Sequence, residues 1–360
     1  MFCLSHTHAG PTLCREDVSK TGGEFIEQYL RHLQSRAVQT AQRALAKAVP
    51  ATLVWGHGKC DLASNRDLPE KGRKRFVVGF NPTQQADDTL LVGRVNARNG
   101  RVLATIVNYA CHPTTLGWDN RLISPDYVGA MREVVELQTQ APCLFLQGAS
   151  GELAPAEQYV GDITVAETHG RRLGHAVLAT LEGMLPAGTE LSFAGVVESG
   201  AALGVWKRST YPVATGLSCE VAEVELPLKP LPSLAEIEER WRGCKDRVFK
   251  ERLWRQRAVR QAVGDGKSAR THVWIWRVGD ALLVGQPHEA YSQFQQKLRQ
   301  QIDPNPVAVM NVVNGWMGYL PPRQLYRRNI YPVWQTPFAP GALELLTEMA
   351  CARARRMIKS

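Results

Sequence analysis

Apolar and polar residues alternate along the chain with two periods, one typical of helices and one typical of strands. The helical period is expected over residues 24–49, 164–184 and 234–263, in a segment after residue 289, and from Pro340 to the end. Short apolar or alternating runs predict strands at residues 51–55, 90–97, 101–110, 143–147, 191–198, 220–226, 272–278, 281–285 and 307–313. Because both kinds of element mix throughout, the sequence predicts an α/β fold of mixed α+β layers.

Turn residues connect several of these elements. Asn99-Gly100 predicts a hairpin between the strands at 90–97 and 101–110, since both residues tolerate the turn geometry. A serine at Ser124, followed by Pro125, predicts a helix N-terminus.

We find no repeat and no low-complexity linker, so we expect one domain over residues 1–360, with a helical excursion at about 205–270. The first eight residues resemble the end of a buried strand. We therefore expect the true start of the protein to lie upstream, with N-terminal strands missing.

Charge adds one unusual segment. The net charge is +9, and nine basic residues crowd into one predicted helix: Arg240, Arg242, Lys245, Arg247, Lys250, Arg252, Arg255, Arg257 and Arg260. A solvated helix face explains such a stretch, while contact with an anionic membrane or an acidic ligand stays open. No nucleic-acid-binding motif accompanies it, so no nucleic acid is expected as a partner.

The eight cysteines are widely spread and form no CxxC pair, which argues against a zinc ribbon or a disulfide framework. No apolar run reaches the roughly eighteen residues that a membrane span needs. As the sequence stands we expect a cytoplasmic protein, with export compatible if an upstream signal precedes it.

Candidate chemistry lies in five short segments. His6 and His8 are two residues apart, a spacing that puts both imidazoles on one face of a strand. His112 follows a predicted strand and precedes a proline. The other three segments are the tight turn from Gln147 to Pro155, Glu289 after a strand and at the expected start of a helix, and a loop that contains Tyr319, Tyr326 and Tyr331. Each is weak alone, because exposed histidines and tight turns are common.

Taken together and in order, these segments resemble the neutral/alkaline, non-lysosomal ceramidase family. The matching elements are SHTHxGP, NxxxHP, SxDxxG, the G[DE]xxP turn, PxE and the GY…Y…Y loop. The resemblance runs from Ser5 to about Ala350. It implies the fold of a ceramidase catalytic domain, without the C-terminal immunoglobulin-like domain of the family.

The resemblance also implies a zinc site and the residues around it. Its zinc ligands fall on His6, His112, Glu289 and Tyr319. Nitrogen and oxygen donors of this kind suit Zn²⁺. Catalytic positions fall on His8, on Arg66, and on Tyr331, which would face the reacting amide. Arginine and tyrosine beside a metal suit the stabilisation of a developing oxyanion.

The turn departs from the family pattern. Its serine, the proposed nucleophile of ceramidases, is replaced by Ala154, and Glu152 replaces an aspartate. We therefore expect a zinc-dependent hydrolase that cleaves an amide (N-acyl) bond by metal-activated water, with Glu152 or His8 as base. The alternative is a catalytically inactive, ceramidase-like domain that binds a ligand. The expected substrate is a small or lipid-like amide, and the oligomeric state stays open.

Overall fold

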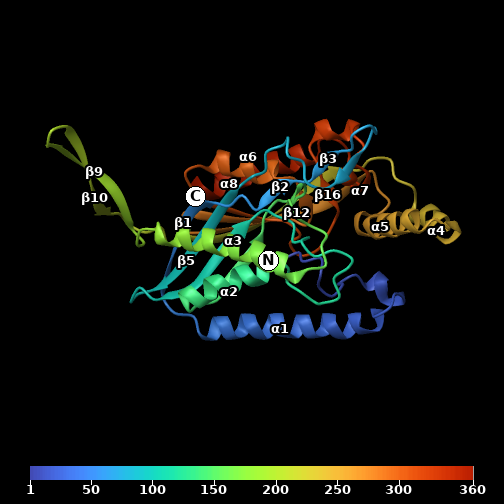
Figure 1. Ribbon diagram of the computed structural model, residues 1–360, viewed down its shortest axis with the longest axis horizontal. Coiled ribbons are helices and arrows are strands. Elements are labelled where there is room, and N and C mark those ends of the chain that lie inside the picture. The colour runs from blue at the N-terminus through green and yellow to red at the C-terminus, as the bar shows by residue number, and fades with distance from the viewer. Residues whose placement is uncertain (360) are drawn as a thin grey trace.

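The computed structural model describes residues 1–359, and its core consists of two four-stranded sheets covered by helices (Figure 1). The first sheet contains β1 (Ala51–Lys59), β5 (Thr89–Ala97), β6 (Val102–Tyr109) and β7 (Cys143–Gln147), in that order. The second contains β11 (Leu217–Pro227), β12 (Ser268–Val278), β13 (Ala281–Gly285) and β15 (Val307–Met310), also in that order. In each sheet the last pair is parallel and the others are antiparallel. The expected mixture of α and β layers is confirmed.

The remaining strands form small antiparallel or parallel pairs. These are β2 (Ala63–Asn65) with β8 (Leu153–Pro155), β3 (Asp67–Pro69) with β4 (Phe76–Val78), β9 (Thr189–Glu198) with β10 (Ala202–Thr210), and β14 (Glu289–Ala290) with β16 (Tyr319–Leu320). The α-helices are α1 (Ile26–Ala46), α2 (Tyr127–Thr139), α3 (Ile163–Glu182), α4 (Leu234–Gly243), α5 (Arg247–Val263), α6 (Gln293–Ile302), α7 (Tyr331–Gln335) and α8 (Ala342–Lys359). Three short 3-10 helices lie at Arg15–Ser19, Gly23–Phe25 and Arg323–Arg327.

Asn108 of β6, the strand beside the edge strand β7, joins the first sheet to the edge strand β15 of the second. Its side-chain amide donates to the Val309 carbonyl of β15 at 2.8 Å and accepts from the Val309 amide at 3.0 Å. The Asn311 amide, just past β15, donates to the Gln147 carbonyl at 3.0 Å. The ends of β6, β7 and β15 therefore lie close together, and the loops that follow them share one region.

Helices α2 and α3 cover the first sheet, while α6 and α8 pack on the second. Close approach of α2 and α3 depends on Gly170, where a Cβ atom would lie 2.3 Å from the Tyr127 carbonyl oxygen. The start of β5 is buried on both faces of the sheet, so Leu90, Leu91 and Val92 are all fully buried.

Two sequence predictions about helix boundaries were wrong. Helix α2 is capped by Asp126, not Ser124, whose hydroxyl instead accepts a hydrogen bond from the Asp126 amide at 3.0 Å. The single helix expected at 234–263 is two helices. Cys244 is extended after α4, and Asp246 caps α5 by accepting from the Phe249 amide. The apolar period continued through this break, so periodicity alone could not locate it.

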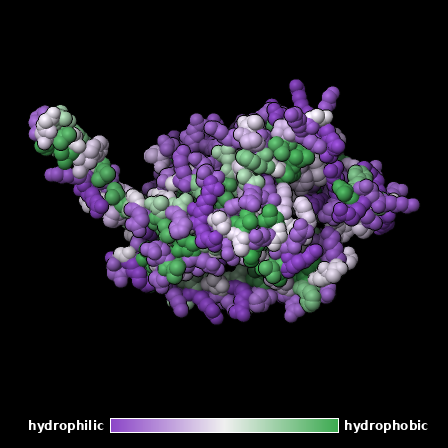
Figure 2. Space-filling model, in the orientation of Figure 1, coloured by the Kyte–Doolittle hydropathy of each residue, from purple (hydrophilic) through white to green (hydrophobic). Residues whose placement is uncertain are grey.

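Strand β10 was also not predicted, and with β9 it forms a hairpin that projects from the body (Figure 1). Phe193 and Trp206 lie on one face of the hairpin with ring centroids 5.8 Å apart, and apolar atoms are visible along it in Figure 2. No helix among residues 1–359 has the length and hydropathy needed to cross a membrane.

Candidate metal centre

Six of the sequence-predicted site residues, His8 among them, meet beside the ends of the central strands. His112 follows β6, while Glu289 and Tyr319 lie opposite each other in the parallel pair of β14 and β16. Arg66 lies between β2 and β3, and its backbone amide donates to the Glu152 carbonyl. His6 arrives from the N-terminal segment. Glu289 was expected to open a helix, but it lies in β14, and α6 begins four residues later.

His112 is fully buried and its tautomer is set by the backbone. Its Nδ1 lies 2.7 Å from the Ser150 carbonyl oxygen and 3.1 Å from that of Leu153. Carbonyl oxygens only accept hydrogen bonds, so Nδ1 carries the proton and Nε2 presents a lone pair. Burial, followed by the nearby Arg66 guanidinium, lowers the pKa of His112 to about 4. The ring is therefore neutral near pH 7.

The lone pair of His112 points at Glu289. Its Nε2 lies 2.9 Å from the Glu289 Oε2. The other carboxylate oxygen, Oε1, accepts a hydrogen bond from the Trp316 indole at 2.7 Å. A neutral imidazole and a carboxylate thus face each other with lone pairs, and a cation between them would satisfy both.

His6 and His8 complete a group of three imidazoles. The nearest ring nitrogens of His6, His8 and His112 all lie within 4.8 Å of one another. The buried Nε2 of His6 has no hydrogen-bond partner and lies 3.7 Å from the Glu289 Oε2. His8 lies on the solvent-exposed side of the group. The residues present therefore fit a metal such as zinc, which takes imidazole and carboxylate ligands.

The strand expected around His6 is absent from the described structure. His6 has a φ of 66°, in the left-handed region that a histidine rarely adopts, so His6 and His8 converge through a turn and not through strand alternation. A strand needs a paired neighbour. Here the first residues instead exchange hydrogen bonds with Asn314, through the amide and carbonyl of Phe2.

Tyr319 and Arg66 form the opposite side of the centre. Arg66 is buried and donates from Nη2 to the Tyr319 hydroxyl at 3.1 Å, and it lies 3.3 Å from the His112 Nε2. Both Nε and Nη2 also donate to the Gly151 carbonyl, at 3.2 Å and 2.8 Å. Burial and the charge of Glu289 raise the pKa of Tyr319 well above its ordinary value. Without a bound metal ion Tyr319 is therefore a neutral phenol, and a bound cation would favour its ionised form.

The other predicted residues have different surroundings. Tyr331 lies against Tyr319, with ring centroids 5.6 Å apart. The carboxylate of Glu152 binds the amide of Ser292 at 3.0 Å and its hydroxyl, at the start of α6, and no described contact joins it to the histidines. Burial raises the pKa of Glu152 to about 7. Ala154 is fully buried in β8, opposite Ser64.

Two residues beside the centre were missed at the level of sequence. Trp316 orients the Glu289 carboxylate, and it lies within the same Asn314-to-Tyr319 segment that drew attention to Tyr319. Arg255 donates from Nη1 to the Tyr331 hydroxyl at 2.9 Å. Arg255 belongs to the basic stretch at residues 240–260, and nothing in the sequence distinguishes it from the other basic residues there.

Comparisons with known proteins concern the fold and part of the sequence. No family model matches the chain. Neutral ceramidase from Pseudomonas aeruginosa is 27% identical over 164 residues, which cover 43% of this chain and 24% of the relative. A crystal structure of neutral ceramidase from Pseudomonas aeruginosa has a TM-score of 0.59 at 17% identity, and the match covers 89% of this chain and 55% of that one.

A second structure, a ceramidase complexed with C2, has a TM-score of 0.56 at 15% identity and covers 88% of this chain and 55% of its own. The chain therefore spans about a quarter of the sequence relative in the matched region and just over half of each solved structure. The resemblance expected from the sequence motifs is confirmed: this chain has the fold of the neutral ceramidases and a distant, partial sequence similarity to one of them.

Proposed function

We propose that the protein is a zinc-dependent hydrolase that cleaves an amide bond of an N-acyl substrate. The main support is the contact between the His112 Nε2 and the Glu289 Oε2, since two groups that both present lone pairs approach to 2.9 Å. The unpartnered Nε2 of His6 adds a third donor directed at the same place. The similarity to neutral ceramidases supports an amide as the bond that is cleaved.

His6, His112, Glu289 and Tyr319 would hold the ion. A zinc ion held there would supply a Lewis acid that polarises a carbonyl and lowers the pKa of water. The chain itself supplies the surrounding charge. Arg66 is fixed by the Gly151 carbonyl and directs Nη2 at the centre, where it can stabilise a negatively charged oxygen. Tyr331 lies beside Tyr319 and carries a hydroxyl for the same purpose.

Proton transfer is assigned to His8. The ring centroids of His8 and His112 are 5.9 Å apart. His8 lies on the solvent-exposed side of the group, so it can exchange protons with water. Glu152, the other candidate base, is bound to Ser292 and supports the start of α6. Ala154 has no nucleophilic atom, which is why the proposal relies on activated water.

A second candidate function is ligand binding without catalysis, and Ala154 is the observation that favours it. The retained donors argue for the hydrolase, because simple ligand binding needs no buried carboxylate facing an imidazole lone pair.

An assay of zinc-loaded protein with fatty-acyl p-nitroanilides and unlabelled N-acyl amides separates the two functions. We expect turnover by the wild type and about a hundredfold loss or more in Glu289→Ala. Glu223→Ala, which changes an exposed carboxylate on β11, serves as the matched control. Binding of these amides without any turnover in the wild type would favour the second function.

A further inference from the structure

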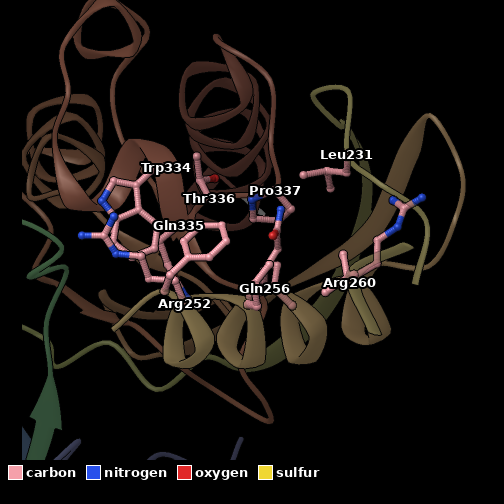
Figure 3. Close-up of a pocket in the computed structure, with 12 residues that line it drawn as sticks. Leu231, Arg252, Gln256, Arg260, Trp334, Gln335, Thr336 and Pro337 are labelled. Carbon is pink, nitrogen blue, oxygen red and sulfur yellow. The ribbon is translucent and has the colours of Figure 1, made fainter. Parts of the chain in front are cut away.

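Helix α5 contacts the short helix α7 through two arginines spaced one turn apart. Arg255 donates from Nη1 to the Tyr331 hydroxyl at 2.9 Å. Arg252 stacks over Trp334, with its Cζ 4.7 Å from the ring centroid. Figure 3 shows Arg252 beside Trp334, with α5 facing residues 334–337. A cavity of about 200 Å³ lies between the helix and these residues. Two residues of α5 three positions apart thus contact two residues of α7 three positions apart.

Helix α7 is too short to hold its own orientation. It has five residues, and an isolated helix of that length is unstable in water. Its end is held by Lys229, whose Nζ donates to the Val333 carbonyl at 3.0 Å. Its start, where Tyr331 lies, is held by Arg255. The direction of the Tyr331 side chain therefore depends on a residue of the basic stretch.

The contact also decides the hydrogen-bond role of the Tyr331 hydroxyl. Arginine has donors only, so the Tyr331 oxygen accepts from Arg255 and its own proton is free for another acceptor. No acceptor for that proton is recorded among residues 1–359. The Tyr331 ring packs on Tyr319 of the candidate metal centre, so an oxygen that develops charge there is a suitable acceptor.

We propose that Arg255 is a positioning residue, which acts through Tyr331 on the reaction of the proposed function. Glu251 binds the Arg255 Nε at 3.2 Å and restrains the guanidinium. Apart from Arg260, which is buried and pairs with Asp265 at 2.9 Å, the other basic residues of α4 and α5 lie at a largely hydrophilic end of the molecule (Figure 2), as a solvated face would. The basic stretch then combines a solvated surface with two arginines that hold α7.

The test is a double-mutant cycle on zinc-loaded protein with a fatty-acyl p-nitroanilide. Arg255→Gln should lower kcat about ten- to hundredfold with little change in KM, since misplaced groups mainly weaken the transition state. Arg255→Lys should restore part of the loss. In a Tyr331→Phe background, Arg255→Gln should have no further effect. Arg247→Gln, an exposed arginine at the start of α5, is the control and should match the wild type.

The proposal is overturned if Arg255→Gln leaves kcat unchanged, or if it lowers kcat equally with and without the Tyr331 hydroxyl. A wild type that turns over no amide would count against the proposed function alone. In that case hydrogen exchange of residues 331–335 decides. Faster exchange in Arg255→Gln than in Arg247→Gln supports the positioning role, and equal exchange overturns it.

Discussion

Arg66 donates from Nη2 to the hydroxyl of Tyr319 at 3.1 Å, while the same nitrogen holds the Gly151 carbonyl at 2.8 Å. One guanidinium thereby ties the turn at Gly151 to the strand that carries Tyr319. Since arginine presents its donors in a rigid fork and lysine does not, the two are not interchangeable at this position.

We expect Arg66→Lys to lower kcat about a hundredfold or more, the usual effect of removing one donor to a developing oxyanion. The measurement is kcat and KM on the best amide substrate, together with urea unfolding. Arg94→Lys is the control, because Arg94 also binds backbone carbonyls, those of Leu181 and Leu185, away from the centre. A stability loss in both variants with an equal loss of kcat would contradict the role of Arg66.

The position of His8 predicts that it is needed for turnover but not for metal retention. His8→Gln should keep its zinc and lose about a hundredfold in kcat, which is typical of removing a general acid or base. His6→Gln is the comparison, and it should lose both zinc and activity. Loss of zinc from His8→Gln would instead make the three-imidazole group the ligand set.

Glu152 should make the protein less stable as pH rises. Its folded pKa of about 7 lies above the ordinary value of 4.5, so the folded state binds the proton more tightly than the unfolded state. The stabilisation is complete below the unfolded pKa and is lost as pH rises through the folded pKa. The difference corresponds to roughly 3 kcal/mol for a fully buried group.

Glu152→Gln cannot ionise and still accepts from the Ser292 amide. Urea unfolding near pH 5 and near pH 8 should therefore show a smaller loss of stability in this variant than in the wild type. Glu167→Gln, at an exposed ion pair on α3, should follow the wild type. Parallel pH profiles for wild type and Glu152→Gln would contradict the raised pKa.

Gly170 allows α3 to approach α2, and Gly170→Ala should destabilise the protein. The added Cβ would lie 2.3 Å from the Tyr127 carbonyl, so the helices must separate, at a cost of about 1–3 kcal/mol. Thermal unfolding measures the effect. Gly183→Ala is the control, because its Cβ would have no contact closer than 3.5 Å. An unchanged Tm in Gly170→Ala would contradict this account of the packing.

Local patterns predicted most helices and strands, since periodicity records which face of an element is buried. They could not reveal the break at Cys244, because apolar residues keep helical spacing on both sides of it. The residues of the candidate site were predicted from the resemblance of short motifs to the ceramidase family, and not from the periodicity of apolar residues. His112 and Glu289 are far apart in sequence, and no local pattern says that a carboxylate in β14 reaches a histidine that follows β6.

Other features of the centre depend on tertiary contacts alone. A left-handed backbone conformation at His6 takes the place of the expected strand, because the first residues bind Asn314 and have no strand partner. Arg255 is one of nine basic residues in its segment, and only its contact with Tyr331 distinguishes it. Side-chain contacts between distant segments therefore carry the information that the sequence patterns lack.

The most direct test of the central claim is elemental analysis of purified protein after growth in zinc, with the wild type beside His112→Ala and Glu289→Ala. We predict about one zinc per chain in the wild type and its loss in both variants, while circular dichroism shows that all three are folded. A folded wild type without metal, or zinc retained in both variants, would contradict the assignment of the centre.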